Sequence, residues 1–242
     1  MSTLLEVRGI SKSFRGLRAV TEASFEVPQG AIRALIGPNG AGKTTCFNVI
    51  AGVFAPDAGA ITFDGRPIHG LRPDQVCRAG IGRTFQIVKP FAGLSVIENV
   101  IVGALKRAPS VPAAKKHAAE IVEKLGLGAK RDLPASSLTL PDRKRLEVAR
   151  ALATRPKLLL LDEVMAGLRP TECDQMVEIF REINRADGLT ILLIEHVMRA
   201  VMALAQHVIV LNHGEVIARG TPAEVVRDAA VLECYLGEEA EV

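Results

Sequence analysis

The chain has 242 residues, of which 48% are hydrophobic and 24% charged, and its formal net charge is +3. This length is sufficient to bury a full hydrophobic core, and the composition is that of an ordinary globular protein. The mild charge, the single tyrosine and the absence of tryptophan argue against nucleic-acid binding, because few aromatic rings are present for bases to stack on.

The first part of the chain is dominated by short β-rich segments bounded by turn residues. We expect strands at 4–10, 19–27 and 31–37, then a glycine-rich loop with a helical pattern behind it, and a further strand at 60–65. Between about residues 95 and 155 the apolar residues recur at helical spacing instead. This change of period predicts a helical insertion.

Strands and helices alternate again in the last third of the chain. Apolar strands are expected at 158–162 and 190–194, each followed by a helix, over 171–186 and 197–206, and a further strand at 207–212. Fully apolar strands that alternate with helices are typical of a parallel sheet buried on both faces. The sequence therefore predicts an α/β core interrupted by helices.

Smaller features have ordinary structural explanations. The basic clusters at 115–116 and 143–145 lie in helical patterns and are expected to face solvent. The four cysteines lie far apart with no CxxC pair, which favours free thiols in a reducing compartment. The segment 214–226 is expected to form a hairpin strand and then a helix capped by Thr221.

Residues 37–45 read GPNGAGKTT, which fits the pattern G-x-x-x-x-G-K-[S/T] between a strand and a helix. Glycines let backbone amides turn toward phosphate oxygens, and the following helix N-terminus adds a favourable dipole. Lys43 would reach the β- and γ-phosphates, and the Thr44 hydroxyl would hold Mg²⁺. We expect a nucleoside triphosphate to be bound by Gly37, Pro38, Asn39, Gly40, Ala41, Gly42, Lys43, Thr44 and Thr45.

An acidic pair ends the apolar strand at 158–162, where Asp162 is followed directly by Glu163. Beside a phosphate loop, Asp162 is placed to hold Mg²⁺, and Glu163 is placed to orient and polarise an attacking water. Acidic pairs also occur at ordinary helix N-termini, so the combination with the loop carries the inference. Together they predict hydrolysis of a nucleoside triphosphate.

Four further features narrow the class of phosphate-loop protein. They are an aromatic residue before the loop (Phe14), a glutamine that opens the helical insertion (Gln86 in GIGRTFQ), a helix start at 138–142, and a histidine after an apolar strand (His196 in LLIEH). In the order and spacing of these features the chain resembles an ABC transporter ATPase along nearly its whole length.

The resemblance implies a P-loop NTPase fold with a RecA-like core, an antiparallel β subdomain and an inserted helical subdomain. The whole chain, 1–242, would form one ABC ATPase domain that binds ATP and Mg²⁺. Its core lobe would comprise 1–86 and 156–242, and its helical subdomain 87–155.

The resemblance also implies roles for single residues. Phe14 would stack on the adenine ring. Gln86 would contact Mg²⁺ or the attacking water and report nucleotide occupancy to a transmembrane partner. His196 would hydrogen-bond the γ-phosphate and hold Glu163 in place. The stretch 166–170 looks like the loop through which two such ATPases contact each other.

At the start of one helix the chain departs from the family pattern, because the signature Leu-Ser-Gly-Gly-Gln aligns with Leu138, Thr139, Leu140, Pro141 and Asp142. In that family two subunits sandwich ATP, and this segment addresses the γ-phosphate held by the opposite subunit. Thr139 keeps a hydroxyl, whereas Pro141 offers no amide and Asp142 brings a negative charge near an anion. Thr139 and Asp142 also fit a capping-box variant, so the helix itself should form well.

These departures predict an asymmetric heterodimer with a second ABC ATPase subunit. This chain would hydrolyse ATP at its own loop, and the opposite site, completed by 138–142, would be slower. Loss of one charge-assisted hydrogen bond, worth about 1.5–3 kcal/mol, would weaken γ-phosphate binding there roughly ten- to a hundredfold. The fixed φ of Pro141 would offset part of this loss by preorganising the turn. The loop at 166–170 also departs, with Arg169 where the family has Asn or Asp.

Within the family, four segments resemble the ATPases of branched-chain amino acid importers: 80–104, 145–156, 192–204 and 217–225. Importers of urea, short amides and other hydrophobic amino acids share this type of ATPase, so those substrates stay open. The implied partners are transmembrane permease subunits and, indirectly, a substrate-binding protein. The apolar runs are too short to span a bilayer and no signal peptide is apparent, so the sequence favours a soluble, cytoplasmic protein. The resemblance to importer ATPases implies that it lies peripherally on the cytoplasmic face of the inner membrane.

Two other classes stay open as alternatives. Stand-alone ABC proteins of DNA repair or translation usually carry two cassettes, a long coiled-coil insertion or zinc cysteines, none of which is found in the sequence. A regulatory P-loop protein without hydrolysis is disfavoured by Glu163 and His196 but kept open by Pro141. The segment 87–100 is either the docking site for a permease helix or ordinary core of the helical subdomain.

Overall fold

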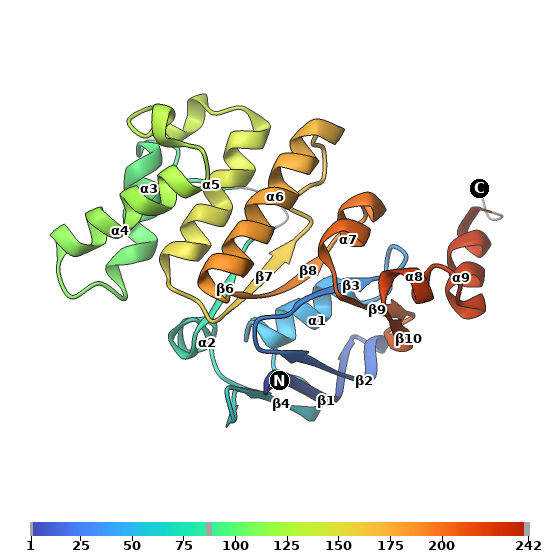
Figure 1. The fold of residues 1–242 in the computed structure, drawn as a ribbon. Helices are drawn as coiled ribbons and strands as arrows, with labels where there is room; N and C mark the ends of the chain where they lie inside the picture. Colours follow the sequence, from blue (N-terminus) through green and yellow to red (C-terminus); the bar gives the residue numbers. More distant parts are fainter. Residues whose placement is uncertain (1, 86–88, 240–242) are drawn as a thin grey trace.

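The computed structural model describes residues 2–85 and 89–239 (Figure 1). Two sheets and a group of helices make up the chain. The smaller sheet is antiparallel, in the order β2-β1-β4-β5. Its strands are β1 (Thr3–Phe14), β2 (Leu17–Pro28), β4 (Ala58–Phe63) and β5 (Arg66–Pro67).

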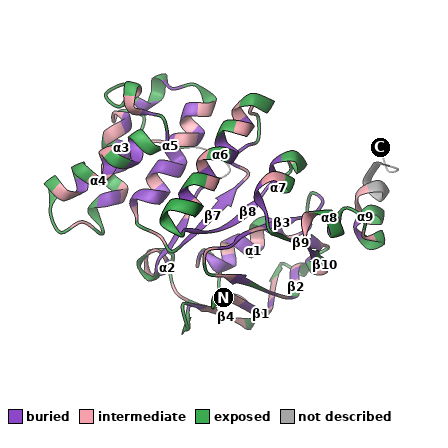
Figure 2. Ribbon diagram, in the orientation of Figure 1, coloured by how far each residue is buried: buried purple, intermediate pink, exposed green. Residues whose placement is uncertain are grey.

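The larger sheet has six strands in the order β10-β9-β3-β8-β7-β6 and is parallel except for the last strand of the chain. Every residue of β7 and β8 is buried, as Figure 2 shows, which confirms the expected two-sided parallel sheet. Its strands are β3 (Ile32–Ile36), β6 (Ile81–Arg83), β7 (Leu158–Asp162), β8 (Thr190–Ile194), β9 (His207–Asn212) and β10 (Glu215–Gly220).

Helices cover both faces of this sheet. On one face, Phe47 of α1 (Lys43–Ile50) shares a buried cluster with Leu35 of β3 and Leu5 of β1, so α1 fills the space between the two sheets. On the other face, Phe180 of α6 and Val201 of α7 pack in a second cluster. The helices that cover the core and close the chain are α2 (Pro73–Ala79), α6 (Pro170–Asp187), α7 (Met198–Leu204), α8 (Pro222–Val225) and α9 (Ala229–Glu239).

The expected helical insertion forms a group to one side of the sheets in Figure 1. Val100, Ala118 and Leu146, one from each of its three long helices, are buried in the same cluster as the outer face of the large sheet. Its elements are α3 (Val96–Leu105), α4 (Val111–Lys124), η1 (Gly128–Lys130), η2 (Ala135–Ser137) and α5 (Leu140–Ala153). The predicted fold class is confirmed, whereas the proposed boundary between 86 and 87 falls outside the described residues.

One surface expectation is wrong. Lys144, in the basic cluster 143–145, is only 4% exposed, whereas Lys115 and Lys116 face solvent as expected. The helical periodicity wrongly predicts a solvent-exposed Lys144. Other elements enclose α5 on more than one side, so some polar residues of this helix are buried. Among the described residues, no helix is long and apolar enough to cross a membrane.

Candidate nucleotide site

The phosphate loop connects β3 to α1 and is packed too closely for side chains at two of its glycines. A Cβ on Gly37 would lie 1.9 Å from the carbonyl oxygen of Leu211, and one on Gly42 would lie 2.2 Å from that of Ala19. Both glycines also have positive φ, 149° and 98°. Only glycine fits these positions, and the loop is thereby held against β9 and β2.

Lys43, the first residue of α1, folds back over this loop. Its ammonium donates hydrogen bonds to the carbonyl oxygens of Gly37 and Pro38, each at 2.7 Å, and the side chain is almost fully buried. The positive charge therefore lies in the concave side of the loop, beside the positive end of a helix dipole. This arrangement is suited to binding a phosphate group.

The loop lines a cleft of about 490 Å³ that also brings together Phe14, Glu163 and His196. Phe14 ends β1 with 37% of its surface exposed, and its ring meets that of Phe54 edge to face at 5.0 Å between centroids. A ring held on one edge and open on its face can receive a flat base. Residues from four distant parts of the sequence thus line one cavity.

Glu163 and His196 are adjacent in this cleft. His196 Nε2 lies 2.7 Å from Glu163 Oε1, while the Glu163 amide donates to the carbonyl oxygen of Ile194 at 2.9 Å. Glu163 has a φ of 50°, a left-handed conformation that is uncommon for a residue with a Cβ. Such a conformation persists only where the surrounding structure enforces it, and at the end of a buried strand it turns the carboxylate toward the loop.

Asp162 is the last residue of β7 and is 1% exposed. Its Oδ2 accepts a hydrogen bond from Arg83 Nη2 at 2.9 Å, and Arg83 Nη1 donates to Asn48 Oδ1 at 2.6 Å. Burial raises the pKa of Asp162, and the neighbouring Arg83 guanidinium opposes that rise. The sequence reasoning missed Arg83; the only available signal was an arginine at the end of a short strand, three residues before Gln86.

The oxygen donors at this end of the site suit Mg²⁺. Asp162 Oδ1 is buried and has no hydrogen-bond partner among the described residues, although a buried carboxylate oxygen normally has one. The Thr44 hydroxyl is exposed at the start of α1. Carboxylate and hydroxyl oxygens are the ligands that Mg²⁺ prefers, so the residues present fit the metal. Gln86, the third expected ligand, lies outside the described residues.

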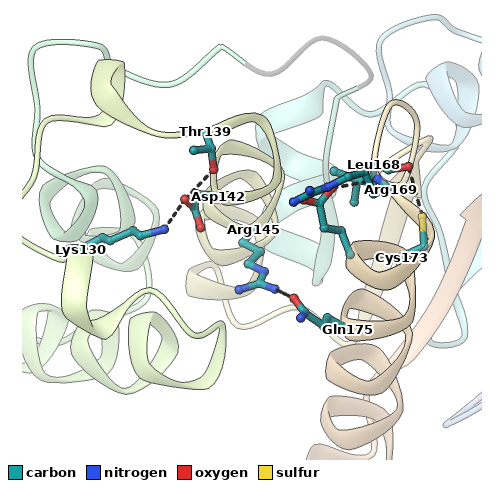
Figure 3. A network of polar contacts seen from close by, with 9 residues as sticks. Lys130, Thr139, Asp142, Arg145, Leu168, Arg169, Cys173 and Gln175 are labelled. Atoms are coloured by element: carbon teal, nitrogen blue, oxygen red, sulfur yellow. Dashed lines mark hydrogen bonds and ion pairs between the residues drawn. The ribbon is translucent and has the colours of Figure 1, made fainter.

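The segment expected to act on a second subunit, 138–142, starts α5, and Figure 3 shows its polar groups facing one another. The Thr139 hydroxyl donates to Asp142 Oδ2 at 2.7 Å, and Lys130 Nζ lies 2.5 Å from the same oxygen. Burial of Asp142 opposes its ionisation, but the two hydrogen bonds together with the positive charges of Lys130 and Arg145 lower its pKa. The carboxylate is therefore charged and balanced within the chain.

The predicted capping box at this helix start is wrong. Thr139 is the N-cap residue, but its side chain accepts no capping hydrogen bond. The hydroxyl turns instead toward the charged Asp142, because a bond to a carboxylate is stronger than one to a neutral amide. By contrast, Ser95 and Thr221 cap α3 and α8 in the ordinary way, the second as expected.

The loop before α6 carries Arg169, which Figure 3 shows beside Leu168. Its guanidinium donates to Glu172 Oε1 through Nε (2.9 Å) and Nη2 (2.6 Å), and the Glu172 side chain in turn accepts from the Arg169 amide. Arg145 of α5 donates to Gln175 Oε1 of α6 at 2.6 Å. The signature helix is thus joined to the helix that follows the loop 166–170.

Comparisons with known proteins find relatives along nearly the whole chain. Residues 20–166 match the ABC transporter family, and 215–241 match the family described as branched-chain amino acid ATP-binding cassette transporter. The chain is 40% identical to the high-affinity branched-chain amino acid transport ATP-binding protein LivG of Salmonella typhimurium, over 97% of this chain and 98% of that one. It is 37% identical to the corresponding protein BraF of Pseudomonas aeruginosa, with the same coverage.

Two further comparisons concern a different transport system and a solved structure. The lipopolysaccharide export system ATP-binding protein LptB of Acidithiobacillus ferridurans is 35% identical over the full length of both chains. The crystal structure of the ADP conformation of MJ1267, an ATP-binding cassette of an ABC transporter, superposes with a TM-score of 0.89 at 31% identity. That match covers 98% of this chain and 100% of the other.

Proposed function

This chain belongs to the ATP-binding proteins of branched-chain amino acid ABC transporters, and from that membership we propose how its residues bind ATP and cleave its terminal phosphate bond. As a member of this family it is an ATP-hydrolysing subunit of an ABC importer. The observation that carries the residue assignment is the cleft in which the phosphate loop, Glu163 and His196 meet.

The proposed binding mode places the triphosphate on the backbone amides of the loop. The Lys43 ammonium would exchange its loop carbonyl partners for β- and γ-phosphate oxygens, and Phe14 would stack on the adenine ring. When bound, Mg²⁺ would neutralise charge on those oxygens, held by Thr44 and by Oδ1 of Asp162, which has no hydrogen-bond partner within residues 2–85 and 89–239. Gln86 stays the proposed third contact.

Glu163 would act as the general base. A water beside the γ-phosphate gives its proton to the Glu163 carboxylate and bonds to phosphorus, while the bond to the bridging oxygen breaks and its electron pair leaves with ADP. His196, whose Nε2 lies 2.7 Å from Glu163 Oε1, would fix the carboxylate in its orientation, and its ring N–H would be shared with the γ-phosphate when ATP is bound. A fixed orientation of the carboxylate increases the rate of hydrolysis, since misplacement of a reacting group by about 1 Å can reduce the rate on the order of a hundredfold.

The partner subunit would be a second ABC ATPase that supplies its own signature to this cleft. In return, the segment 138–142 would bind the γ-phosphate of the nucleotide held by the partner subunit. Pro141 lacks an amide, and the Thr139 proton is directed at Asp142 instead of outward. Both features support a slower second site and an asymmetric heterodimer.

The permease is proposed to dock on an apolar groove between the core lobe and the helical group. This groove has a volume of about 300 Å³ and includes the exposed side chains of Phe85, Phe91 and Val102. Val96 and Val100, in contrast, are fully buried in the core. Within the segment 87–100, the exposed Phe91 is therefore available for docking, whereas Val96 and Val100 belong to the core of the helical subdomain. Docking there would place this chain on the cytoplasmic face of the membrane.

Branched-chain amino acids are the transported substrate that the comparisons favour. The match at 215–241 and the two relatives at 40% and 37% identity share this description, whereas the lipopolysaccharide export relative is less similar at 35%. Copurifying the chain with its native permease and binding protein, and identifying the bound small molecule, tests the assignment. Recovery of urea or an amide would overturn it.

Calorimetry with ATP tests the nucleotide site. Lys43→Ala should weaken ATP binding roughly ten- to a hundredfold, because a charge-assisted contact of about 1.5–3 kcal/mol is lost. Lys157→Ala is the matched control, since Lys157 pairs with Asp64 on an exposed surface. ATP binding by Lys43→Ala as tight as by the unaltered chain would exclude the proposed site.

A further inference from the structure

Lys144 is a buried lysine that the proposed mechanism does not use. It lies in α5, two residues beyond the signature segment, and its Nζ donates to the backbone carbonyl oxygen of Glu163 at 3.0 Å. Burial lowers the pKa of Lys144, and the negative charges of Glu195, Glu163 and Glu147 oppose that change. A buried ammonium is costly, so its retention at the catalytic loop calls for an explanation.

Glu195 is a second buried ionisable side chain at the same loop, and it precedes His196. Only 2% of its surface is exposed. Its Oε1 accepts a hydrogen bond from the Met165 amide at 2.9 Å, and its Oε2 has no hydrogen-bond partner among the described residues. Lys144 and Glu195 also interact electrostatically across this loop. Each therefore offsets part of the cost of burying the other.

These contacts hold a three-residue segment from two sides. The Glu163 carbonyl is bound from α5 and the Met165 amide from the loop after β8, while the Glu163 amide is bound to Ile194. Between these contacts Glu163 keeps its left-handed backbone. We propose that Lys144 and Glu195 are positioning residues that fix this segment and thereby aim the Glu163 carboxylate at the attacking water beside the γ-phosphate. The inference rests on the proposed role of Glu163 in hydrolysis.

This arrangement has a consequence for the two sites of the dimer. Lys144 belongs to the helix whose first turn would face the partner's nucleotide, while its ammonium holds the loop of this chain's own base. A displacement of α5 would therefore move the Glu163 carbonyl with it. Lys144 thus joins the signature helix directly to the backbone of the proposed base.

The experiment is steady-state ATP hydrolysis by the full transporter containing Lys144→Met. Methionine keeps the length and apolar contacts of the side chain but cannot donate to Glu163. We expect kcat to fall by at least about tenfold, with KM for ATP within about twofold, because the base is misplaced and nucleotide binding is not. Lys116→Met, at an exposed position of α4, is the matched control. A raised KM with unchanged kcat would overturn the proposal.

A double variant separates positioning from folding. Lys144→Met alone leaves Glu195 without its opposite charge and should lower the melting temperature. Lys144→Met combined with Glu195→Gln removes both charged groups and should recover the melting temperature, but kcat should stay low because the Glu163 carbonyl still lacks the hydrogen bond from Lys144. Recovery of kcat together with stability would mean that the role is only structural.

A third experiment tests whether Lys144 affects the rate of hydrolysis through Glu163. In single-turnover measurements, Lys144→Met should change the residual rate of a Glu163→Gln chain by less than about twofold, since both changes act through one carboxylate. A further tenfold loss would overturn the proposal. If Glu163→Gln alone left hydrolysis intact, the proposed base would be wrong, whatever Lys144 does.

Discussion

Lys130 and Asp142 form an ion pair across the start of the signature helix, with Nζ 2.5 Å from Oδ2 (Figure 3). The Asp142 side chain is largely buried, whereas Lys130 remains about half exposed. The negative charge that the sequence places at the signature is therefore balanced by a cation from η1. An approaching nucleotide would meet a neutral pair with the ammonium on its exposed side.

Removing that cation should weaken the second site. In Lys130→Ala, Asp142 would present an unbalanced charge to the γ-phosphate of the partner's ATP, and we expect the apparent KM of the assembled transporter to rise about five- to tenfold. Adding Asp142→Asn should reverse most of the rise. Lys124→Ala is the control, because Lys124 forms a comparable ion pair with Asp187 elsewhere. An unchanged KM in Lys130→Ala would show that the pair does not face nucleotide.

Pro141→Gly tests whether the missing amide limits turnover. Glycine restores a backbone donor at the second position of α5, so we expect the ATPase rate of the complex to rise several-fold. Pro112→Gly is a close control, because Pro112 occupies the equivalent position of α4, away from the signature. If the rate is unchanged or lower in Pro141→Gly, the fixed φ of proline matters more than the lost donor.

The sequence predicted those parts of the site that depend on short-range spacing. The phosphate loop follows β3 directly, Asp162 ends β7 and Glu163 comes next, so the local pattern was enough to predict where they lie. The fold class followed from apolar runs such as β7 and β8. Arg83, Lys130, Lys144 and Glu195 escaped prediction because their roles depend on contacts between distant segments, such as Lys130 with a residue of the next helix.

The same reason explains the two wrong expectations. Lys144 was expected to face solvent because its neighbours are basic, but a helix enclosed on several sides buries some of its polar positions. The sequence spacing predicts that Thr139 caps α5, but its hydroxyl hydrogen-bonds to the charged Asp142 carboxylate instead. Spacing alone does not show which of these two hydrogen bonds is the stronger. Sequence spacing predicts that the helix forms, whereas tertiary contacts determine which partners its polar side chains bind.

Arg83→Ala should destabilise the chain substantially. It leaves Asp162 buried without its opposite charge, which typically costs about 3–5 kcal/mol, and should lower the melting temperature by roughly 6–20 °C. Adding Asp162→Asn should recover most of the loss, since no buried charge then stays unpaired. Arg8→Ala is the control, because its pair with Glu6 is exposed and should contribute little. Equal melting temperatures for Arg83→Ala and Arg8→Ala would contradict the ion pair's importance.

Glu195 makes the stability of the chain depend on pH in a definite direction. Burial raises its pKa from 4.5 to about 7, partly opposed by the Met165 amide and Lys144. Between these values the folded chain binds a proton that the unfolded chain has already released. The free energy of unfolding therefore falls as the pH rises through this window, and the loss is complete above about pH 7.

Glu195→Gln should remove this dependence. Urea unfolding at about pH 5 and about pH 8 should show the unaltered chain losing roughly 2–3 kcal/mol more than the variant between the two conditions. The comparison concerns the change with pH, because the substitution also removes the partner charge of Lys144 and so shifts the absolute stability. Glu147, whose pKa burial also raises, is present in both chains and cancels in the difference. Parallel pH profiles for the two chains would show that the Glu195 carboxyl is ionised throughout, and that its charge is fully balanced at the catalytic loop.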